Sequence, residues 1–268
     1  MPSSASMPSA STTVTAATRT VEGLLEDLHP TLQPETIVEF EHAGARHIVP
    51  RLRLVGAAAG HDPIRIGIFA GLHGDEPAGC SALIEFANAI AEEPSLADGF
   101  EFFLYPVLNP TGYEQNTRHN ANDKDLNREF WRDSDEVEVQ AIERELRAHT
   151  FAGIITLHAD DTCEGVYGYT HGRVLNEALL KPALDAASAF LPVDSRAVID
   201  GFPAQGGLIC QCFQGVLSAP CEQRPQPFDV IFETPAYASF DLQVSAALAA
   251  LKAIVARYPG FISYAQDL

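Results

Sequence analysis

Short apolar runs alternate with amphipathic segments along most of the chain. Four runs are short and apolar enough to predict buried strands, at residues 64–70, 100–107, 153–158 and 230–232. Apolar residues at helical spacing predict helices at 21–28, 78–92, 136–149, 173–190 and 241–257, the fourth with an interruption at Pro182. Strands that alternate with helices are typical of a mostly parallel mixed sheet with helices on both faces, so we predict a single α/β domain.

Shorter β-like segments and the first residues complete this organisation. Residues 36–41 and 45–54 flank Gly44 and predict a hairpin at a sheet edge, and 166–169, 195–199 and 208–213 are further candidate strands. The first 20 residues are rich in Ser, Thr and Ala and lack the basic start and apolar core of a secretory signal. We therefore expect a disordered tail over 1–20 and one domain over 21–268.

Charge and cysteine usage narrow the classes of partner and compartment. The net charge of −19, from 36 acidic residues against 17 Lys and Arg, argues against a nucleic acid or an anionic membrane as partner. No apolar run approaches membrane-spanning length. Five scattered cysteines, an odd number, favour a reduced, cytoplasmic protein. Cys210 and Cys212 would share one face of a strand, where buried cysteines are favoured over a metal pair. The oligomeric state stays open.

The turn between the 64–70 strand and the 78–92 helix carries the first candidate chemistry. It contains His73 and Glu76, and Pro77 suits the first helical position. Open α/β sheets place their ligands at the carboxyl ends of strands. An imidazole and a carboxylate three residues apart can reach one small cation, and Zn²⁺ favours such nitrogen and oxygen ligands. The alternative is a solvated turn with an acidic residue that stabilises a helix N-terminus.

Two further strands end in groups that complete this site. The 153–158 strand ends at His158, and the 230–232 strand is followed by Glu233. Because strands of a parallel sheet share an end, these residues can converge with His73 and Glu76. Two histidines and a glutamate with an open position make a catalytic zinc set. Glu233 could then take a proton from a metal-bound water and return it to a leaving amine. Taken alone, His158 could be a satisfied core histidine and Glu233 a loop acid.

The polar loop between the 100–107 strand and the 136–149 helix adds Arg118, Asn127 and Arg128. Arginines near a metal can hold an oxyanion or bind a substrate carboxylate through two hydrogen bonds. The alternative is that each arginine is a surface charge, with Arg128 paired to Asp125 or Glu129.

As a set, these residues resemble the zinc carboxypeptidase superfamily, which includes carboxypeptidase A-like peptidases and the succinylglutamate desuccinylase/aspartoacylase deacylases. The motifs, in chain order, are His73-Gly-Asp-Glu76, Asn109-Pro-Thr-Gly-Tyr113, Arg118, Asp125-Leu-Asn-Arg128-Glu-Phe, Leu157-His158 and Phe232-Glu233-Thr-Pro. The resemblance implies one zinc ion held by His73, Glu76 and His158, with Glu233 as general base and acid. It also implies that Arg118 polarises the scissile carbonyl, and that Asn127 and Arg128 hold a substrate carboxylate.

The implied activity is zinc-dependent hydrolysis of an amide next to a free carboxylate, in a small peptide or an N-acyl amino acid. Gln205 lies where carboxypeptidases carry a mobile tyrosine, which leaves the choice between these substrates open. Family members tend to have a cis peptide just after the third ligand, here Ala159–Asp160. The arginines and zinc should make the pocket locally positive. The alternatives are a non-catalytic zinc or ligand-binding protein and a nucleotide-binding domain, although the glycine fingerprint of the latter is missing.

Overall fold

A mixed eight-stranded sheet forms the centre of the computed structural model, which describes residues 19–57 and 62–266. The strand order is β1-β2-β4-β3-β5-β10-β6-β9. The strands are β1 Glu35–His42, β2 Ala45–Val55, β3 Ile64–Phe69, β4 Phe100–Tyr105, β5 Gly153–Asp160, β6 Tyr167–Thr170, β9 Leu208–Ile209 and β10 Phe228–Pro235. A separate small hairpin joins β7 Val198–Ile199 to β8 Phe202–Pro203. Residues 1–18 of the predicted tail lie outside the described residues.

The middle of the sheet is parallel, as predicted. Strands β4, β3, β5 and β10 run parallel to one another. The strands on either side of this group are antiparallel to it, β2 beside β4 and β6 beside β10. The predicted edge hairpin is confirmed, because β1 pairs with β2 and stands at the end of the strand order among the described residues. Parallel central strands bring their carboxyl ends to one edge, where the candidate residues lie.

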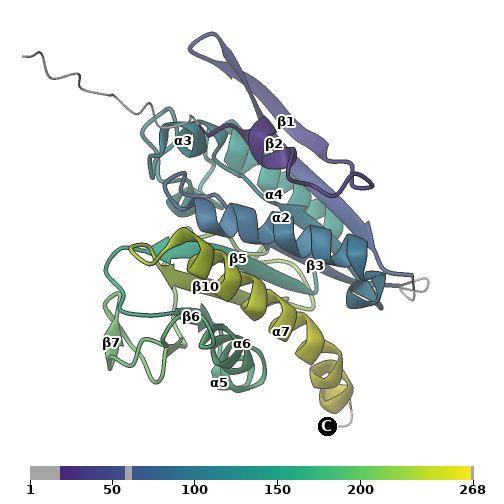
Figure 1. Cartoon of the computed structure of the whole chain (residues 1–268), viewed down its shortest axis with the longest axis vertical. Helices are drawn as coiled ribbons and strands as arrows, with labels where there is room; N and C mark the ends of the chain where they lie inside the picture. Colours follow the sequence, from purple (N-terminus) through teal and green to yellow (C-terminus); the bar gives the residue numbers. More distant parts are fainter. Residues whose placement is uncertain (1–18, 58–61, 267–268) are drawn as a thin grey trace, which may run out of the picture.

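Helices cover both faces of the sheet (Figure 1). They are α1 Val21–Leu25, α2 Pro77–Glu92, α3 Pro110–Gln115, α4 Val137–His149, α5 Arg173–Leu175, α6 Lys181–Ala187 and α7 Phe240–Gln266, with 3₁₀ turns at Pro94–Ala97 and Leu126–Arg128. Helices α2, α6 and α7 lie across one face, and the larger core cluster fills the space beneath them. Helix α4 packs on the other face through Val139, Ile142 and Leu146.

Two sequence-based predictions need correction at the level of local structure. The 173–190 segment is a helix in three pieces, because a π-helical turn, Asn176–Leu180, separates α5 from α6. The 208–213 strand ends at Ile209, so Cys210 is exposed and Cys212 is partly exposed. The expectation of two buried strand cysteines was therefore wrong, since the chain leaves the sheet before it reaches them.

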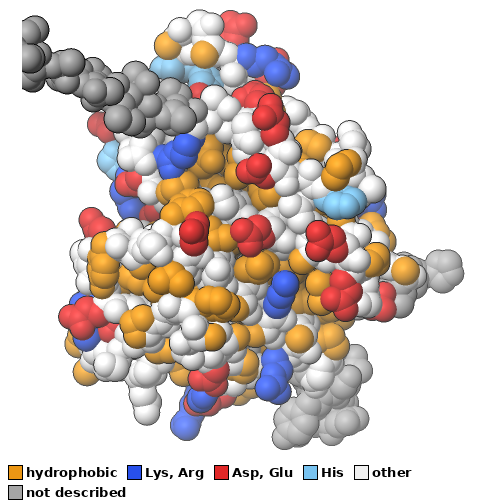
Figure 2. All heavy atoms as spheres, in the orientation of Figure 1, with side chains coloured by type: hydrophobic (Ala, Val, Ile, Leu, Met, Phe, Trp, Pro, Cys, Tyr) orange, Lys and Arg blue, Asp and Glu red, His pale blue; other side chains and the backbone are white. Residues whose placement is uncertain are grey.

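The surface matches the acidic composition. In the view of Figure 2, Asp and Glu side chains are spread among apolar ones over the face formed by α2, α6 and α7. Within the described residues, no helix is both long and apolar enough to cross a bilayer.

Candidate metal centre and active-site cavity

The turn that carries His73 and Glu76 is held against a second loop by a close backbone contact. A Cβ atom added to Gly74 would lie 1.8 Å from the carbonyl carbon of Gly112, so only glycine fits there. The buried Asn109 side chain supports the same contact, because its Nδ2 donates to the Leu72 carbonyl at 3.3 Å. The Asn-Pro-Thr-Gly-Tyr motif therefore has a structural part, which is to hold the His73 turn in place.

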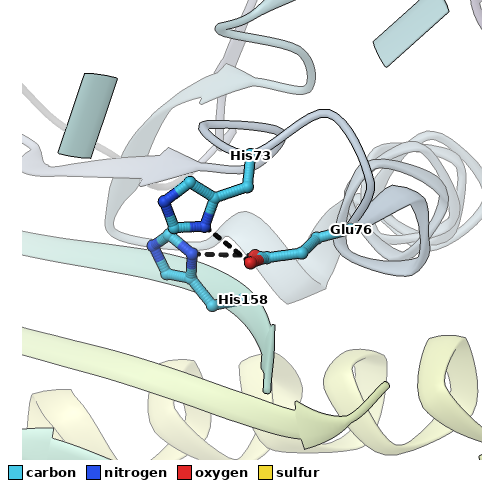
Figure 3. Close-up of side chains that lie close together, drawn as sticks. All are labelled: His73, Glu76 and His158. Carbon is cyan, nitrogen blue, oxygen red and sulfur yellow. Dashed lines mark hydrogen bonds and ion pairs between the residues drawn. The ribbon is translucent and has the colours of Figure 1, made fainter. Parts of the chain in front are cut away.

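His73, Glu76 and His158 converge at the carboxyl ends of β3 and β5 (Figure 3). Glu76 lies between the two imidazoles, 2.6 Å from Nδ1 of His73 and 2.9 Å from Nδ1 of His158. All three side chains are buried, and their ligand atoms lie within 4.8 Å of one another. Two histidine nitrogens and one carboxylate that face the same position are the donor set of a catalytic zinc site. These residues therefore fit the ion that the sequence predicts.

Asp125 is a residue of this centre whose role the sequence analysis did not assign. Its Oδ1 lies 3.1 Å from Nε2 of His73, and its Oδ2 accepts hydrogen bonds from Arg118. A carboxylate that accepts the outer N–H of a ligating histidine fixes the tautomer and leaves the other ring nitrogen free for a metal. The signal was present in the sequence, because Asp125 precedes Asn127 in the Asp-Leu-Asn-Arg motif.

The charges of this centre shift one another's pKa values. Burial by itself raises the pKa of Glu76, but the two histidines outweigh it and hold that pKa well below its ordinary value. Burial lowers the pKa of His73, whereas the Glu76 carboxylate and Asp125 raise it to about 9 overall. Burial lowers the pKa of His158, and Glu76 offsets only part of that effect. The ligand set therefore holds an ionised carboxylate in a position from which water is largely excluded.

Glu233 lies directly across the sheet from His158. The parallel register of β10 and β5 pairs these two residues. The sequence placed both at strand ends, but each strand continues for two more residues, to Pro235 and Asp160. Burial raises the pKa of Glu233 well above its ordinary value, and the carboxylates of Glu76 and Asp160 raise it further. A carboxyl with a raised pKa beside a metal centre is suited to accept and return a proton.

One cavity of about 410 Å³ unites all seven predicted site residues. Its lining includes His73, Glu76, Arg118, Asn127, Arg128, His158 and Glu233. It also includes Cys212 and residues that the sequence analysis did not single out: Asp75, Asp161, Thr162, Tyr167, Tyr169, Asp200, Phe213, Val216, Ile231 and Ala236. The seven predicted residues come from four separate parts of the chain, and the convergence of His73, His158 and Glu233 is what the sequence predicted from shared strand ends.

Parts of the sequence are similar to known proteins. Residues 63–167 match the succinylglutamate desuccinylase/aspartoacylase catalytic domain. A 66-residue segment is 36% identical to carboxypeptidase SOL1 of Arabidopsis thaliana and covers 22% of this chain and only 13% of that protein. The matched segment therefore represents a small part of that relative.

Solved structures extend the likeness to most of the chain. A protein from Shewanella denitrificans, provisionally named a metallopeptidase, superposes with a TM-score of 0.72 at 22% identity over 88% of this chain and 87% of that one. A metallo-carboxypeptidase from Burkholderia cenocepacia gives 0.67 at 17% identity, over 90% and 68% of the two chains. A metallo-carboxypeptidase from Pseudomonas aeruginosa gives 0.63 at 18% identity, over 88% and 66%.

The chain has a metallo-carboxypeptidase-like fold. The predicted resemblance and the predicted fold class are both confirmed. In this carboxypeptidase-like fold, the His73–Glu76–His158 cluster comes from the turn before α2 and from β5, in the chain order that the sequence motifs predicted.

The three polar residues of the 116–130 loop occupy different positions in the cavity. Arg118 is ion-paired to Asp125 at 3.0 Å and lies 3.6 Å from Glu76 Oε1. Asn127 is buried, with Oδ1 accepting from the Leu217 backbone N–H at 3.0 Å and Nδ2 3.4 Å from His158 Nε2. Both ends of this amide are thus engaged by protein groups, and its predicted role in substrate binding stays a prediction.

Arg128 is available to a ligand in a way that Arg118 is not. Its Nη1 donates to the Asn127 carbonyl at 2.8 Å, and its guanidinium lies 4.7 Å from the centroid of the Phe213 ring. Among the described residues, no acidic side chain lies within ion-pair distance of it, so the alternative pairing with Asp125 or Glu129 is not observed. A guanidinium fixed by a carbonyl and a ring retains donors for a planar anion.

Two expectations about the cavity were wrong. The Ala159–Asp160 peptide has the ordinary trans form, and both residues continue β5 in parallel register with Thr234 and Pro235 of β10. The cavity is not lined by an excess of positive charge either. Its acidic lining residues, Asp75, Glu76, Asp160, Asp161, Asp200 and Glu233, outnumber Arg118 and Arg128. Positive side-chain charge is confined to the side of the cavity formed by the 116–130 loop.

Proposed function

We propose that this protein is a zinc-dependent hydrolase that cleaves an amide bond next to a free carboxylate. The observation that carries the proposal is the convergence of His73, Glu76 and His158 with Glu233 on one cavity of a carboxypeptidase-like fold. A bound zinc ion would supply Lewis-acid polarisation and a water of lowered pKa. The substrate is a small peptide or an N-acyl amino acid.

The chain's own residues have separate tasks in this reaction. Glu233 takes a proton from the attacking water and delivers it to the leaving amine, which breaks the C–N bond. Arg118, at the rim beside Glu76, stabilises the negative charge that develops on the carbonyl oxygen. Asp125 holds His73 in the tautomer whose Nδ1 faces the metal position.

Arg128 is the group proposed to bind the substrate carboxylate, with Asn127 beside it. The P. aeruginosa metallo-carboxypeptidase was solved in complex with (2-guanidinoethylmercapto)succinic acid, a ligand that carries carboxylates. A carboxylate bound by Arg128 would lie next to Phe213 and inside the cavity that holds the metal-ligand cluster. In this position the free carboxylate belongs to the substrate residue whose nitrogen forms the scissile amide bond.

The test combines metal analysis with matched substrates. We expect one zinc per chain in purified protein by elemental analysis, and loss of that zinc in His158→Ala. We expect hydrolysis of N-benzoylglycyl-amino acids and N-acyl amino acids with a free carboxylate, and much slower hydrolysis of their carboxamides. Arg128→Ala should remove the preference for the free acid, and Arg128→Lys should restore it poorly because the contact needs a planar fork.

Three results would contradict the proposal. The first is protein that neither contains zinc nor takes it up. The second is zinc-loaded protein that hydrolyses none of these amides, which would favour a binding protein that retains the pocket. The third is equal turnover of free acids and carboxamides by the wild type, which would remove the carboxylate contact from the assignment.

A further inference from the structure

A second cavity of about 320 Å³ adjoins the active-site cavity. The two cavities share a wall formed by Tyr169, Cys212, Phe213, Val216 and Ile231. Phe213 is also the ring over which the Arg128 guanidinium lies. A substrate residue whose carboxylate is bound by Arg128 therefore lies next to this wall, and its side chain can extend into the second cavity.

The same face of β10 runs from one cavity to the other. Side chains alternate along a strand, so Asp229, Ile231 and Glu233 point to one side. Glu233 lines the active-site cavity, Ile231 lies in the shared wall, and Asp229 lines the second cavity. At a rise of about 3.3 Å per residue, Asp229 lies on the order of 13 Å along the strand from Glu233. This separation suits the long stem of a lysine or arginine side chain.

Asp229 is a carboxyl group that lacks an adequate partner. Its side chain is 20% exposed, and its Oδ1 is buried without a hydrogen bond among the described residues. The nearest cationic candidate is Nδ1 of His171, 3.8 Å from Oδ2, on a side chain that is itself 61% exposed. Burial raises the pKa of Asp229 to about 7. A buried carboxylate without a paired cation is costly, so a ligand that brings a cation would relieve that cost.

The walls above Asp229 suit an apolar stem. They include the aromatic rings of Phe130, Trp131 and Phe213, with Leu217 beside them. Such walls match the methylene chain of a lysine or arginine side chain, whose charged head would meet Asp229. Arg132 also borders the cavity, but it is exposed, so water screens its charge.

Cys212 and His171 are close enough to suggest a different chemistry. Cys212 Sγ lies 3.3 Å from Nε2 of His171, so Cys212, His171 and Asp229 form a chain of three polar groups. Burial raises the pKa of the Cys212 thiol, and the charge of Asp229 raises it further. The thiol is therefore held in its neutral form, whereas a nucleophilic cysteine needs a lowered pKa. This arrangement favours a polar wall over a second nucleophile.

Resting on the proposed function, we propose that Asp229 forms the floor of a subsite for a cationic side chain. The preferred substrate then carries a lysine- or arginine-like group on the residue that has the free carboxylate. The net charge of −19 favours the approach of a substrate that carries such a cationic group.

A binding experiment tests the subsite without turnover. The probes are L-arginine and L-citrulline, which have similar length and shape but differ in charge, titrated by calorimetry into zinc-loaded wild type and Asp229→Asn. We expect wild type to bind arginine about 30-fold or more tightly than citrulline, the lower end of what loss of one partner of a buried charge pair costs. Asp229→Asn should bind the two equally. Equal binding by the wild type would overturn the proposal.

Hydrolysis separates this inference from the function on which it rests. N-benzoylglycyl-arginine and N-benzoylglycyl-citrulline should differ in kcat/KM by a similar factor in wild type and not in Asp229→Asn. Equal hydrolysis of both by wild type would overturn the subsite and leave the hydrolase intact. No hydrolysis, with arginine binding that still depends on Asp229, would overturn the hydrolase and retain the subsite.

A control distinguishes Asp229 from its neighbour. His171→Gln removes the imidazole that faces Asp229 but keeps the carboxyl group, so the preference for arginine should persist. If the preference were lost in His171→Gln and kept in Asp229→Asn, the assignment to Asp229 would be wrong. Thermal denaturation of each variant checks folding, and the comparison of arginine with citrulline in wild type does not depend on any variant.

Discussion

Replacing Glu233 by glutamine separates proton transfer from metal binding. Glutamine has nearly the same shape as glutamate but cannot accept and return the proton. Glu233 is outside the His73–Glu76–His158 cluster, so the variant should still contain one zinc per chain. Loss of general acid–base catalysis lowers kcat by about 10²- to 10⁴-fold. That factor corresponds to about 2.7–5.5 kcal/mol of activation free energy.

The same substitution should not weaken the fold. Burial and the neighbouring carboxylates of Glu76 and Asp160 disfavour the charged form of Glu233, as its raised pKa shows. A neutral amide avoids that cost, so we expect a melting temperature no lower than that of wild type. A loss of turnover could then not be attributed to unfolding.

The assay is hydrolysis of an N-benzoylglycyl-amino acid at matched zinc content, with elemental analysis and thermal denaturation of the same samples. Glu164→Gln is the matched control, because it makes the same exchange at an exposed carboxylate that lies outside the cavity lining. Its turnover should equal that of wild type. Turnover of Glu233→Gln within a few-fold of wild type would refute the assignment of the base.

Three other predictions test the support around the site. Asp125→Asn should weaken zinc affinity by about 10- to 100-fold through His73, measured by competition with a chelator; unchanged affinity would exclude the positioning role. Gly74→Ala should lower the free energy of unfolding by about 1–3 kcal/mol in urea, because its Cβ has no space. Burial raises the pKa of Glu145, but hydrogen bonds to its carboxylate outweigh this effect and lower the pKa to about 2. Glu145 therefore stabilises the fold at pH values above its unfolded pKa of about 4.3, and this contribution is lost as the pH falls toward 2. Glu145→Gln should cost about 1–3 kcal/mol at pH 7, because Arg51 loses one of its two carboxylate partners and keeps Glu35. The same variant should reduce the acid sensitivity of urea unfolding.

The sequence was informative about the central elements because their patterns are local. The apolar run before His73 and Pro77 after it define both the strand and the start of α2, and the structure has them within one residue. Parallel strands share an end by geometry, which is why His158 and Glu233 could be brought together with His73 without a contact map. The Gln205 stretch lies away from the cavity lining, so it adds nothing to the choice of substrate.

Other features of the structure could not be predicted from local sequence patterns. Cys212 leaves the sheet because β9 ends at Ile209, and no periodicity in the 208–213 run marks that end. The cis bond expected after Ala159 came from the resemblance and not from a local pattern, and the structure has the trans form that non-proline residues strongly favour. Asp229 reads as an ordinary polar residue before an apolar strand. Its isolation is visible only when β5, β6 and the 210–218 loop surround it.

The parallel register of β10 with β5 also limits how this strand can change length. Asp229, Ile231 and Glu233 share a face only because they are separated by even numbers of residues. Insertion or deletion of a single residue between Asp229 and Glu233 would turn one of the two carboxyl groups toward the apolar core under α7, where Val230 and Phe232 now pack. Single-residue indels at this position should therefore be absent from functional descendants of this chain, whereas side-chain exchange at residue 229 leaves the geometry at residue 233 unchanged.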